Sequence, residues 1–207
     1  MDRLSLGDVR IHRIEEWQGV FLSPQQLFTG FDEADYVRVK TQVPEGTLDT
    51  GNDEIHAQLQ SWVVDINGMK VLIDTGAGNH KERPGIPLFG QLETPFIERL
   101  AAAGFAPEDI DMVICTHLHV DHVGWNTKLV GDTWVPMFPN AQYVASRTEL
   151  EVRDPKRGAR EKPDASWGPY LDSVQPIVDA GMMRIVEGDE NLMPGIDLVP
   201  IPGHAPA

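Results

Sequence analysis

Cysteine is nearly absent, because the 207-residue sequence holds a single one, Cys115. A lone thiol cannot form an internal disulfide, so the fold does not depend on oxidation. Because Cys115 lies in a short apolar run, we interpret it as a buried strand residue and not as a nucleophile.

Long hydrophobic runs are missing as well. No stretch approaches the roughly 18 apolar residues that a membrane-spanning helix needs. Residues 1–8 lack the apolar run of a signal peptide. These absences favour a cytoplasmic protein.

Positive charge is scarce. The 17 lysines and arginines are outnumbered by 32 aspartates and glutamates, which gives a formal net charge of −15. A surface that acidic repels phosphate backbones and anionic lipid head groups, so it disfavours nucleic acids and membranes as partners. The expected partner is a small-molecule substrate, and the oligomeric state stays open between a monomer and a homodimer.

Strands and helices alternate along the chain, which predicts an α/β layered domain. In residues 58–76, two apolar runs meet at Asn67-Gly68, a pair suited to the type I′ turn of a hairpin. A helix is predicted over residues 94–104, with Thr94 as its N-cap and Pro95 at its first position. A strand buried on both faces is predicted over residues 111–116. Further strands are expected at residues 9–16, 142–145, 182–186 and 198–201, and helices at 146–152 and 173–180.

Four candidate metal ligands follow the predicted buried strand: His117, His119, Asp121 and His122. Imidazole nitrogens and carboxylate oxygens are the usual ligands of zinc and similar divalent ions. On an extended backbone, His117 and His119 project to the same side. The adjacent Asp121 and His122 would point apart, which suits a second metal beside the first. Because α/β folds place their sites at the ends of strands, we favour a metal centre over a solvated histidine-rich loop.

The segment from Val113 to Gly124, with its Thr-His-Leu-His-Val-Asp-His core, resembles the signature of the metallo-β-lactamase superfamily. Val71 to Gly76 resembles the strand and turn that precede the first helix in that family, and Ile201-Pro202-Gly203-His204 resembles its Pro-Gly-His segment. The order and spacing of the three also fit, and the resemblance extends from residue 58 to the end. Residues 74–81 and 121–126 resemble a narrower group of lactonases and methyl-parathion-hydrolase-like enzymes.

The resemblance implies an αββα sandwich whose second half is incomplete in a C-terminally truncated chain. The family's bridging aspartate and last histidine have no counterpart before residue 207. We expect one domain over residues 1–207, in which residues 1–57 form an N-terminal strand and aromatic segment and residues 58–207 form the metal-binding core.

Carried over by the same resemblance, the first metal site consists of His117, His119 and His204. Asp121 and His122 contribute to a second site, and Asp121 also orients the nucleophile. Two zinc ions are expected in a complete domain, although manganese, iron and cobalt accept the same ligands. Without the family's bridging carboxylate, we expect the first site to form more readily than the second.

The implied function is that of a metal-dependent hydrolase, in which a metal-bound hydroxide attacks a small ester-like substrate. A lactone is favoured, and an organophosphate or a thioester is the alternative substrate within the superfamily. An inactive metal-binding fragment is a further alternative, suggested by the apparent truncation. A nuclease of the same superfamily is disfavoured by the acidic charge.

Asp74 and Trp125 each have two interpretations. Asp74 either hydrogen-bonds a ligand histidine or only forms a turn before Gly76. Trp125 either lines a pocket or packs in the core. The basic run over residues 153–162 is interpreted as a solvated loop, and three histidines without partners at ligand spacing are interpreted as surface or structural residues: His12, His56 and His80.

Overall fold

The computed structural model of the protein describes residues 2–49, 51–156 and 169–205. The chain divides into two compact units, one formed by Met1–Glu16 with Gln60–Ala207 and the other by Trp17–Leu59. The expected single domain over the whole chain, with its division after residue 57, stays a prediction. Within the described residues, no helix is long and apolar enough to span a membrane.

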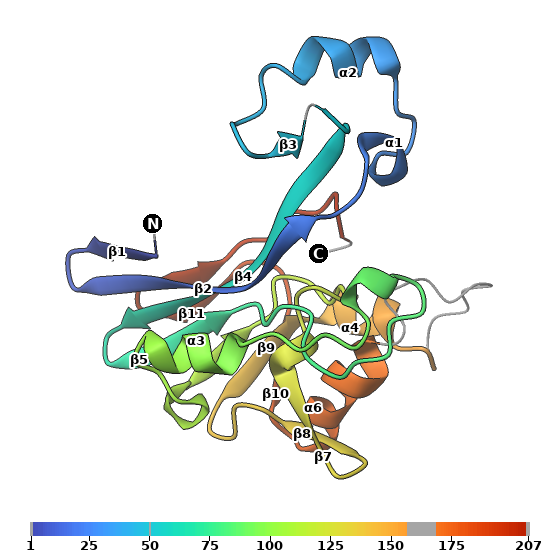
Figure 1. Ribbon diagram of the computed structural model, residues 1–207. Helices are drawn as coiled ribbons and strands as arrows, with labels where there is room; N and C mark the ends of the chain where they lie inside the picture. The colour runs from blue at the N-terminus through green and yellow to red at the C-terminus, as the bar shows by residue number, and fades with distance from the viewer. Residues whose placement is uncertain (1, 50, 157–168, 206–207) are drawn as a thin grey trace. The chain divides into compact units, whose positions relative to one another are not determined.

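A mixed β-sheet forms the framework of the larger unit (Figure 1). Its strands are hydrogen-bonded in the order β1-β2-β4-β5-β6-β9-β10. Strands β5, β6, β9 and β10 run parallel to one another, whereas β1 pairs antiparallel with β2 and β4 with β5. The bounds are Arg3–Leu6 for β1, Val9–Val20 for β2, Glu54–Ile66 for β4, Met69–Ile73 for β5, Met112–Ile114 for β6, Gln142–Ser146 for β9 and Met183–Val186 for β10.

Short elements complete this unit. The helices are α3 (Phe96–Ala102), α4 (Arg147–Arg153), the π-helix η4 (Tyr170–Val174) that continues into α6 (Gln175–Asp179), and the 3-10 turns η1 (Pro87–Phe89), η2 (Pro107–Asp109) and η3 (Gly124–Asn126). Two antiparallel hairpins are formed by β7 (Thr127–Val130) with β8 (Thr133–Pro136) and by β11 (Glu190–Met193) with β12 (Ile196–Leu198).

Strand β6 is buried on both faces, as its uninterrupted apolar run predicted. Val113 belongs to the larger core cluster, together with Leu100 of α3 and Ile177 of α6. Ile114 belongs to a second cluster, against which Leu198 of β12 packs. Helices therefore cover one face of the sheet, and the β11–β12 hairpin packs against the other. This mixed arrangement confirms the α/β class.

The hairpin of β4 and β5 forms at the predicted turn. Asn67 and Gly68 adopt φ values of 52° and 78°, which are the two positive values that a type I′ turn requires. The register pairs Ile66 with Met69 and Trp62 with Ile73. This local signal places the end of β5, and with it Asp74, against the neighbouring strand β6.

The predicted cap of α3 was wrong. The helix begins at Phe96, its N-cap is Pro95, and no side chain caps it. Thr94 is engaged elsewhere, because its backbone N–H and its hydroxyl both donate to Asn79 Oδ1, at 2.8 and 3.1 Å. The C-terminus is as predicted, since Gly104 closes the helix with a φ of 97°.

Two boundaries near the C-terminus also differ from prediction. The strand expected at residues 198–201 is β12, which ends at Leu198. Pro200 and Pro202 lack the N–H that a ladder needs, so the pairing stops there. The helix expected from residue 173 begins earlier, at Tyr170. Pro176 lies in the first turn of α6, directly after the π-helical turn η4.

The smaller unit contains α1 (Pro24–Leu27), α2 (Glu33–Val39) and β3 (Leu48–Asp49), which pairs antiparallel with β4. Asp32 caps α2, because its carboxylate accepts a 2.9 Å hydrogen bond from the N–H of Asp35. Part of the aromatic segment noted in the sequence, including Phe28 and Phe31, lines an apolar cavity of about 460 Å³ in this unit.

Candidate metal centre

The candidate site lies at the carboxyl ends of three parallel strands, β5, β6 and β9. Register pairs place β5 beside β6 and β6 beside β9, all running in the same direction. Asp74 follows β5, Thr116 and His117 follow β6, and Ser146 ends β9 and caps α4. The carboxyl ends of parallel strands meet at one edge of a sheet, which is where α/β folds place their sites.

Three of the predicted ligands gather at this edge. The donor atoms of His117, His119 and His204 all lie within 4.8 Å of one another. Nδ1 of His119 is 3.1 Å from Nε2 of His204. The ring of His117 packs edge-on against both, with centroids 4.5 Å from His119 and 5.1 Å from His204. His117 and His119 therefore lie on the same side, as predicted, although His204 is 85 residues beyond His119.

The chemistry of these three donors fits a divalent metal. Two nitrogens bound to one tetrahedral zinc at about 2.0–2.1 Å would lie about 3.3–3.4 Å apart, close to the His119–His204 separation. Nε2 of His117 is buried and has no hydrogen-bond partner among the described residues. A buried nitrogen without a partner is costly unless another ligand satisfies it. Three neutral imidazoles would also leave one tetrahedral position open.

Asp121 and His122 turn toward each other, which corrects the expectation that they point apart. Oδ2 of Asp121 is 3.4 Å from Nε2 of His122. Residues 120–122 form a turn in which the N–H of His122 donates to the carbonyl of His119, so the alternation of an extended chain does not apply. The ring of His122 lies beside that of His117, with centroids 3.9 Å apart. The pair thus adjoins the three-histidine group.

Asp74 connects the ends of β5 and β6. Its carboxylate accepts hydrogen bonds from the N–H and the hydroxyl of Thr116, both at 2.8 Å, and lies 2.8 Å from Nδ1 of His122. The hydroxyl of Thr116 is in turn 3.1 Å from Nδ1 of His117. Asp74 also has the left-handed φ of 55° typical of a turn residue. Asp74 therefore contacts a candidate ligand histidine and also occupies a turn, so the interpretation of Asp74 as a turn residue alone was wrong.

The surroundings set the protonation of the histidines. Burial, reinforced by His122 and His119, lowers the pKa of His117 to about 4. Burial and the guanidinium of Arg153 lower the pKa of His119. Burial opposes protonation of His122, but its hydrogen bonds to Asp121 and Asp74 prevail and raise its pKa to about 10. His117 and His119 are thus neutral at pH 7, which is the form that binds metals.

Glu16, which no sequence pattern had indicated, joins the loop after β5 to the turn η3. Its buried carboxylate accepts the N–H groups of Ala77 and Gly78, at 2.7 and 2.9 Å, and the indole N–H of Trp125 at 2.7 Å. Trp125 is only 7% exposed and stacks on Phe96, so it packs in the core and does not line a pocket. No local pattern marks Glu16, because its partners lie 61–109 residues away.

Glu149 was not predicted from the sequence to lie near the site, and the prediction that Arg153 lies in a solvated loop was wrong. Oε2 of Glu149 accepts the N–H of Leu118 at 2.8 Å, between the two ligand histidines. Arg153 is 5% exposed in α4, where a solvated loop was predicted, and contacts Nε2 of His119 at 2.5 Å. Glu149 and Arg153 are four residues apart on one helical face, which a helix extended to residue 153 would have revealed. Residues 157–162 of that basic run lie outside the described residues.

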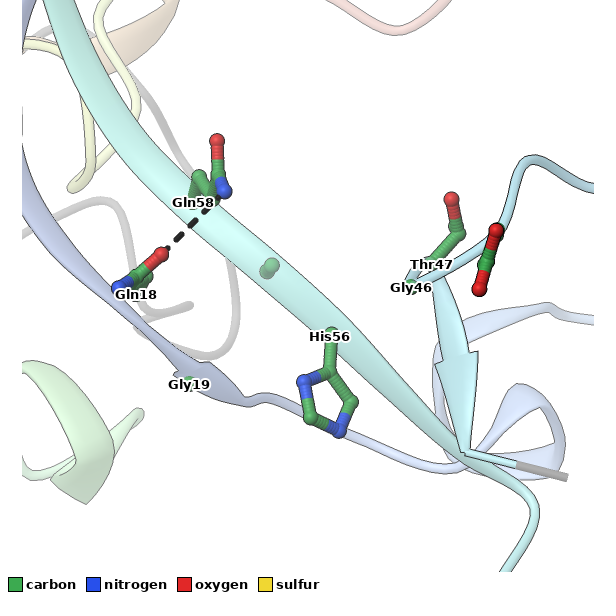
Figure 2. A pocket seen from close by; sticks show the side chains of 8 residues that line it. Gln18, Gly19, Gly46, Thr47, His56 and Gln58 are labelled. Atoms are coloured by element: carbon green, nitrogen blue, oxygen red, sulfur yellow. Dashed lines mark hydrogen bonds between the residues drawn. The ribbon is translucent and has the colours of Figure 1, made fainter.

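The three remaining histidines do not belong to the three-histidine group. His12 packs edge-on against Phe105, and His80 is exposed. His56 is exposed on β4 and lines a polar cavity of about 710 Å³ in the smaller unit (Figure 2). Its neighbours there include Gln18 and Gln58, whose amides are hydrogen-bonded at 3.4 Å (Figure 2). None of the predicted ligands lines this cavity.

The sequence is similar to that of a curated lactonase. An N-acyl homoserine lactonase of Bacillus cereus is 28% identical over 172 residues, which cover 77% of this chain and 59% of the lactonase. The chain thus spans little more than half the length of that relative.

Two solved structures share the fold. The hydrolase AbOPH of the beta lactamase superfamily has a TM-score of 0.67 and 23% identity, covering 91% of this chain and 63% of its own. AidC, a dizinc quorum-quenching lactonase in complex with a product, has a TM-score of 0.59 and 16% identity, covering 92% and 62%. The family model described as the metallo-beta-lactamase superfamily matches residues 57–207, which are well over half of the sequence. The chain therefore belongs to the metallo-β-lactamase superfamily.

Proposed function

We propose that this protein is a metal-dependent hydrolase of a small ester-like substrate, with a lactone as the favoured class. The observation that carries the proposal is the convergence of His117, His119 and His204 within 4.8 Å at the ends of parallel strands. The lactone is supported by the curated relatives named N-acyl homoserine lactonase, which match at 28% identity.

The metal would be held by residues of this chain. His117, His119 and His204 would hold the first ion, and Asp121 and His122 would contribute to a second. We propose zinc for both, supported by the donor types and by the dizinc lactonase that shares the fold. When bound, zinc lowers the pKa of a coordinated water toward about 7 and so makes hydroxide available to attack the substrate at neutral pH.

The surrounding residues would orient these ligands and the nucleophile. Asp74 contacts His122 directly and reaches His117 through the hydroxyl of Thr116. Burial raises the pKa of Asp121, but its contact with His122 prevails and lowers it below the usual value. Asp121 is therefore ionised at neutral pH, so that a carboxylate oxygen can accept a hydrogen bond from the attacking water.

A cavity beside the histidines suits a substrate with an apolar part. It measures about 500 Å³, and both His117 and His204 line it. Much of its remaining lining is apolar, including Val144, Val186 and Leu198. Pockets for small ligands combine such apolar walls with few polar groups that fix orientation. An ester carbonyl near the histidines, with its apolar portion along these strands, would match that pattern.

Metal content and hydrolysis, measured on the same preparation, test the proposal. We expect at least one zinc per chain by elemental analysis, and turnover of an N-acyl homoserine lactone exceeding that of a phosphotriester and a thioester. His117→Ala should abolish both metal and turnover, whereas His56→Ala, at an exposed histidine outside the group, should change neither.

Three outcomes would count against the proposal in different ways. A folded chain without metal would overturn the metal site. Metal binding without turnover of any of the three substrates would identify an inactive metal-binding fragment. Faster turnover of the phosphotriester or thioester would overturn the lactone preference and leave the hydrolase.

A further inference from the structure

The loop after β5 and the turn η3 meet at one buried carboxylate, that of Glu16. Oε2 of Glu16 accepts the N–H of Ala77 at 2.7 Å, and Oε1 accepts the N–H of Gly78 at 2.9 Å. Oε1 also accepts the indole N–H of Trp125 at 2.7 Å. Glu16 is 1% exposed, so water competes little for these donors. One side chain of β2 therefore holds two segments that are distant in sequence.

Each of these segments includes a residue that belongs to the second candidate site or contacts it. The loop that is held through Ala77 begins with Asp74. The turn that is held through Trp125 comes directly after the segment with Asp121 and His122. Nδ1 of His122 lies 2.8 Å from Oδ2 of Asp74. The separation of the two segments thus sets how Asp74 and His122 meet.

The backbones of the two segments lie in close contact beside Glu16. The N–H of Gly124 donates to the carbonyl of Gly76 at 2.7 Å. A Cβ on Gly76 would lie 2.0 Å from Oε2 of Glu16, and a Cβ on Gly78 would lie 2.6 Å from the backbone of Gly124. Only glycine permits this approach of the backbone to the carboxylate. A change at Glu16 is therefore transmitted to both segments.

The first candidate site is supported by a different element. The N–H of Leu118, between His117 and His119, donates to Oε2 of Glu149 at 2.8 Å. Glu149 belongs to α4, whereas Glu16 belongs to β2. Each candidate site thus has its own supporting carboxylate, and the two can be altered separately.

We propose that Glu16 is a positioning residue for the second metal site, which acts through the loop that begins with Asp74 and the turn that follows His122. By holding both segments on one carboxylate, Glu16 fixes the distance at which Asp121 and His122 would meet a metal. Without this link the distance varies, which lowers the affinity of the second site and leaves the three histidines of the first site in place. This inference rests on the proposed function.

Separate measurement of the two zinc affinities tests this role. Calorimetric titration of the full chain with zinc, after removal of bound metal, gives one dissociation constant for each site. His122→Ala, which should lack the second binding event, assigns that event. Glu16→Gln replaces a carboxylate oxygen with an NH₂ group, which cannot accept the N–H that faces it. It should weaken the second site about tenfold to a hundredfold, the range for groups that orient metal ligands, and leave the first within about twofold.

Glu98→Gln is the matched control. It makes the same chemical change at an exposed glutamate of α3 and should alter neither dissociation constant. Trp125→Phe is a smaller perturbation, because it keeps an aromatic ring against Phe96 and removes only the indole N–H. It should weaken the second site less than Glu16→Gln does. The double variant should lose less than the sum of the two, because both changes break the same link.

Two results would overturn the role of Glu16. Equal weakening of both sites in Glu16→Gln would show that the carboxylate supports the fold in general, and unchanged affinities in the folded variants would show that the second site does not depend on it. If Glu16→Gln does not fold, Trp125→Phe decides between the same outcomes. A wild-type chain that binds one zinc ion would overturn the second site of the proposed function and this inference with it, and a chain that binds none would overturn the whole metal centre.

Discussion

The side chains around the candidate site contact one another although their residues lie far apart in the sequence. Asp74 illustrates this, because one carboxylate contacts both Thr116 and His122 across 42 to 48 residues of sequence. The sequence offered two readings of Asp74 and could not choose between them, since hydrogen-bond partners at such distances leave no periodic pattern. By contrast, the candidate ligands could be named from the sequence, because histidines and a carboxylate at short spacing directly after a buried strand are typical of a metal site.

The first prediction concerns Asp74. Replacing it with Asn keeps the size and tolerates the φ of 55°, but it removes the charge that holds His122 and Thr116. We expect Asp74→Asn to lower the free energy of unfolding by about 1–3 kcal/mol. Asp74→Ala should cost about 1 kcal/mol more, because alanine is strained at positive φ. Urea denaturation of both variants checks the order, and equal losses would remove the backbone strain from the explanation.

At the scale of elements, close backbone contacts and buried hydrogen bonds hold together the loops that surround the candidate site. The loop after β5 and the turn η3 after His122 approach so closely that a Cβ on Gly124 would lie 1.9 Å from the carbonyl of Ala77. Glu16 of β2 ties the same loops together by accepting N–H groups from both. Glu149 of helix α4 accepts the N–H of Leu118, between the candidate ligands His117 and His119. The candidate site is thus supported by β2 and α4, which the ligand motif itself does not include.

The second prediction compares two glycines. Gly124→Ala must displace backbone, so we expect it to lower the free energy of unfolding by about 3 kcal/mol or more. Gly131 has a φ of 60° but open space around it, so Gly131→Ala should cost only about 1 kcal/mol. Thermal or urea unfolding distinguishes them. Similar losses in the two variants would mean that the site loops can separate at little cost.

Lys81 links the loop after β5 to η4. Its side chain is fully buried, and Nζ donates to the hydroxyl of Thr127 at 2.6 Å and lies 3.6 Å from a carboxylate oxygen of Asp172. Nζ also lies 3.5 Å from the ring centroid of Trp134. Burial is the main cause that lowers the pKa of Lys81 to about 7, against the ordinary value of 10.5.

The third prediction follows from that pKa. Between about pH 7 and pH 10.5 the unfolded chain binds more protons than the folded chain, so the free energy of unfolding rises with pH in that window. Lys81→Met removes this contribution. Relative to the variant, the wild type should gain on the order of a few kcal/mol as pH rises through the window, measured by urea denaturation. A difference that does not change with pH would show that Lys81 keeps its charge when buried.

At the scale of the whole molecule, the net charge of −15 is the dominant long-range property. It disfavours polyanionic partners, because neutralising phosphates requires clusters of lysine and arginine. The expected partner remains a small molecule, and the oligomeric state stays open between monomer and homodimer.

The fourth prediction tests that charge. Fluorescence anisotropy with labelled duplex DNA and single-stranded RNA should show no binding at micromolar protein and 150 mM salt. Saturable binding that weakens with added salt would contradict the prediction and would reopen the nuclease alternative.

Most of the structure that could be predicted from the sequence alone depends on local patterns of residues. The α/β class, the Asn67-Gly68 hairpin, the doubly buried β6 and the helix expected over residues 146–152 all depend on neighbours within a few residues, where turn geometry and side-chain periodicity act directly. The resemblance added His204 to the first site, and the structure brings it beside His119.

Tertiary structure alone decided the rest. Only the folded chain brings Glu16 to Trp125 and Glu149 to the N–H of Leu118, and only there does Arg153 meet His119. The convergence of Asp121 and His122 likewise depends on a turn that the motif does not encode. The physical reason is common to all of them: a hydrogen bond between distant residues depends on how strands and helices pack, and packing leaves no signature in the residues on either side of each partner.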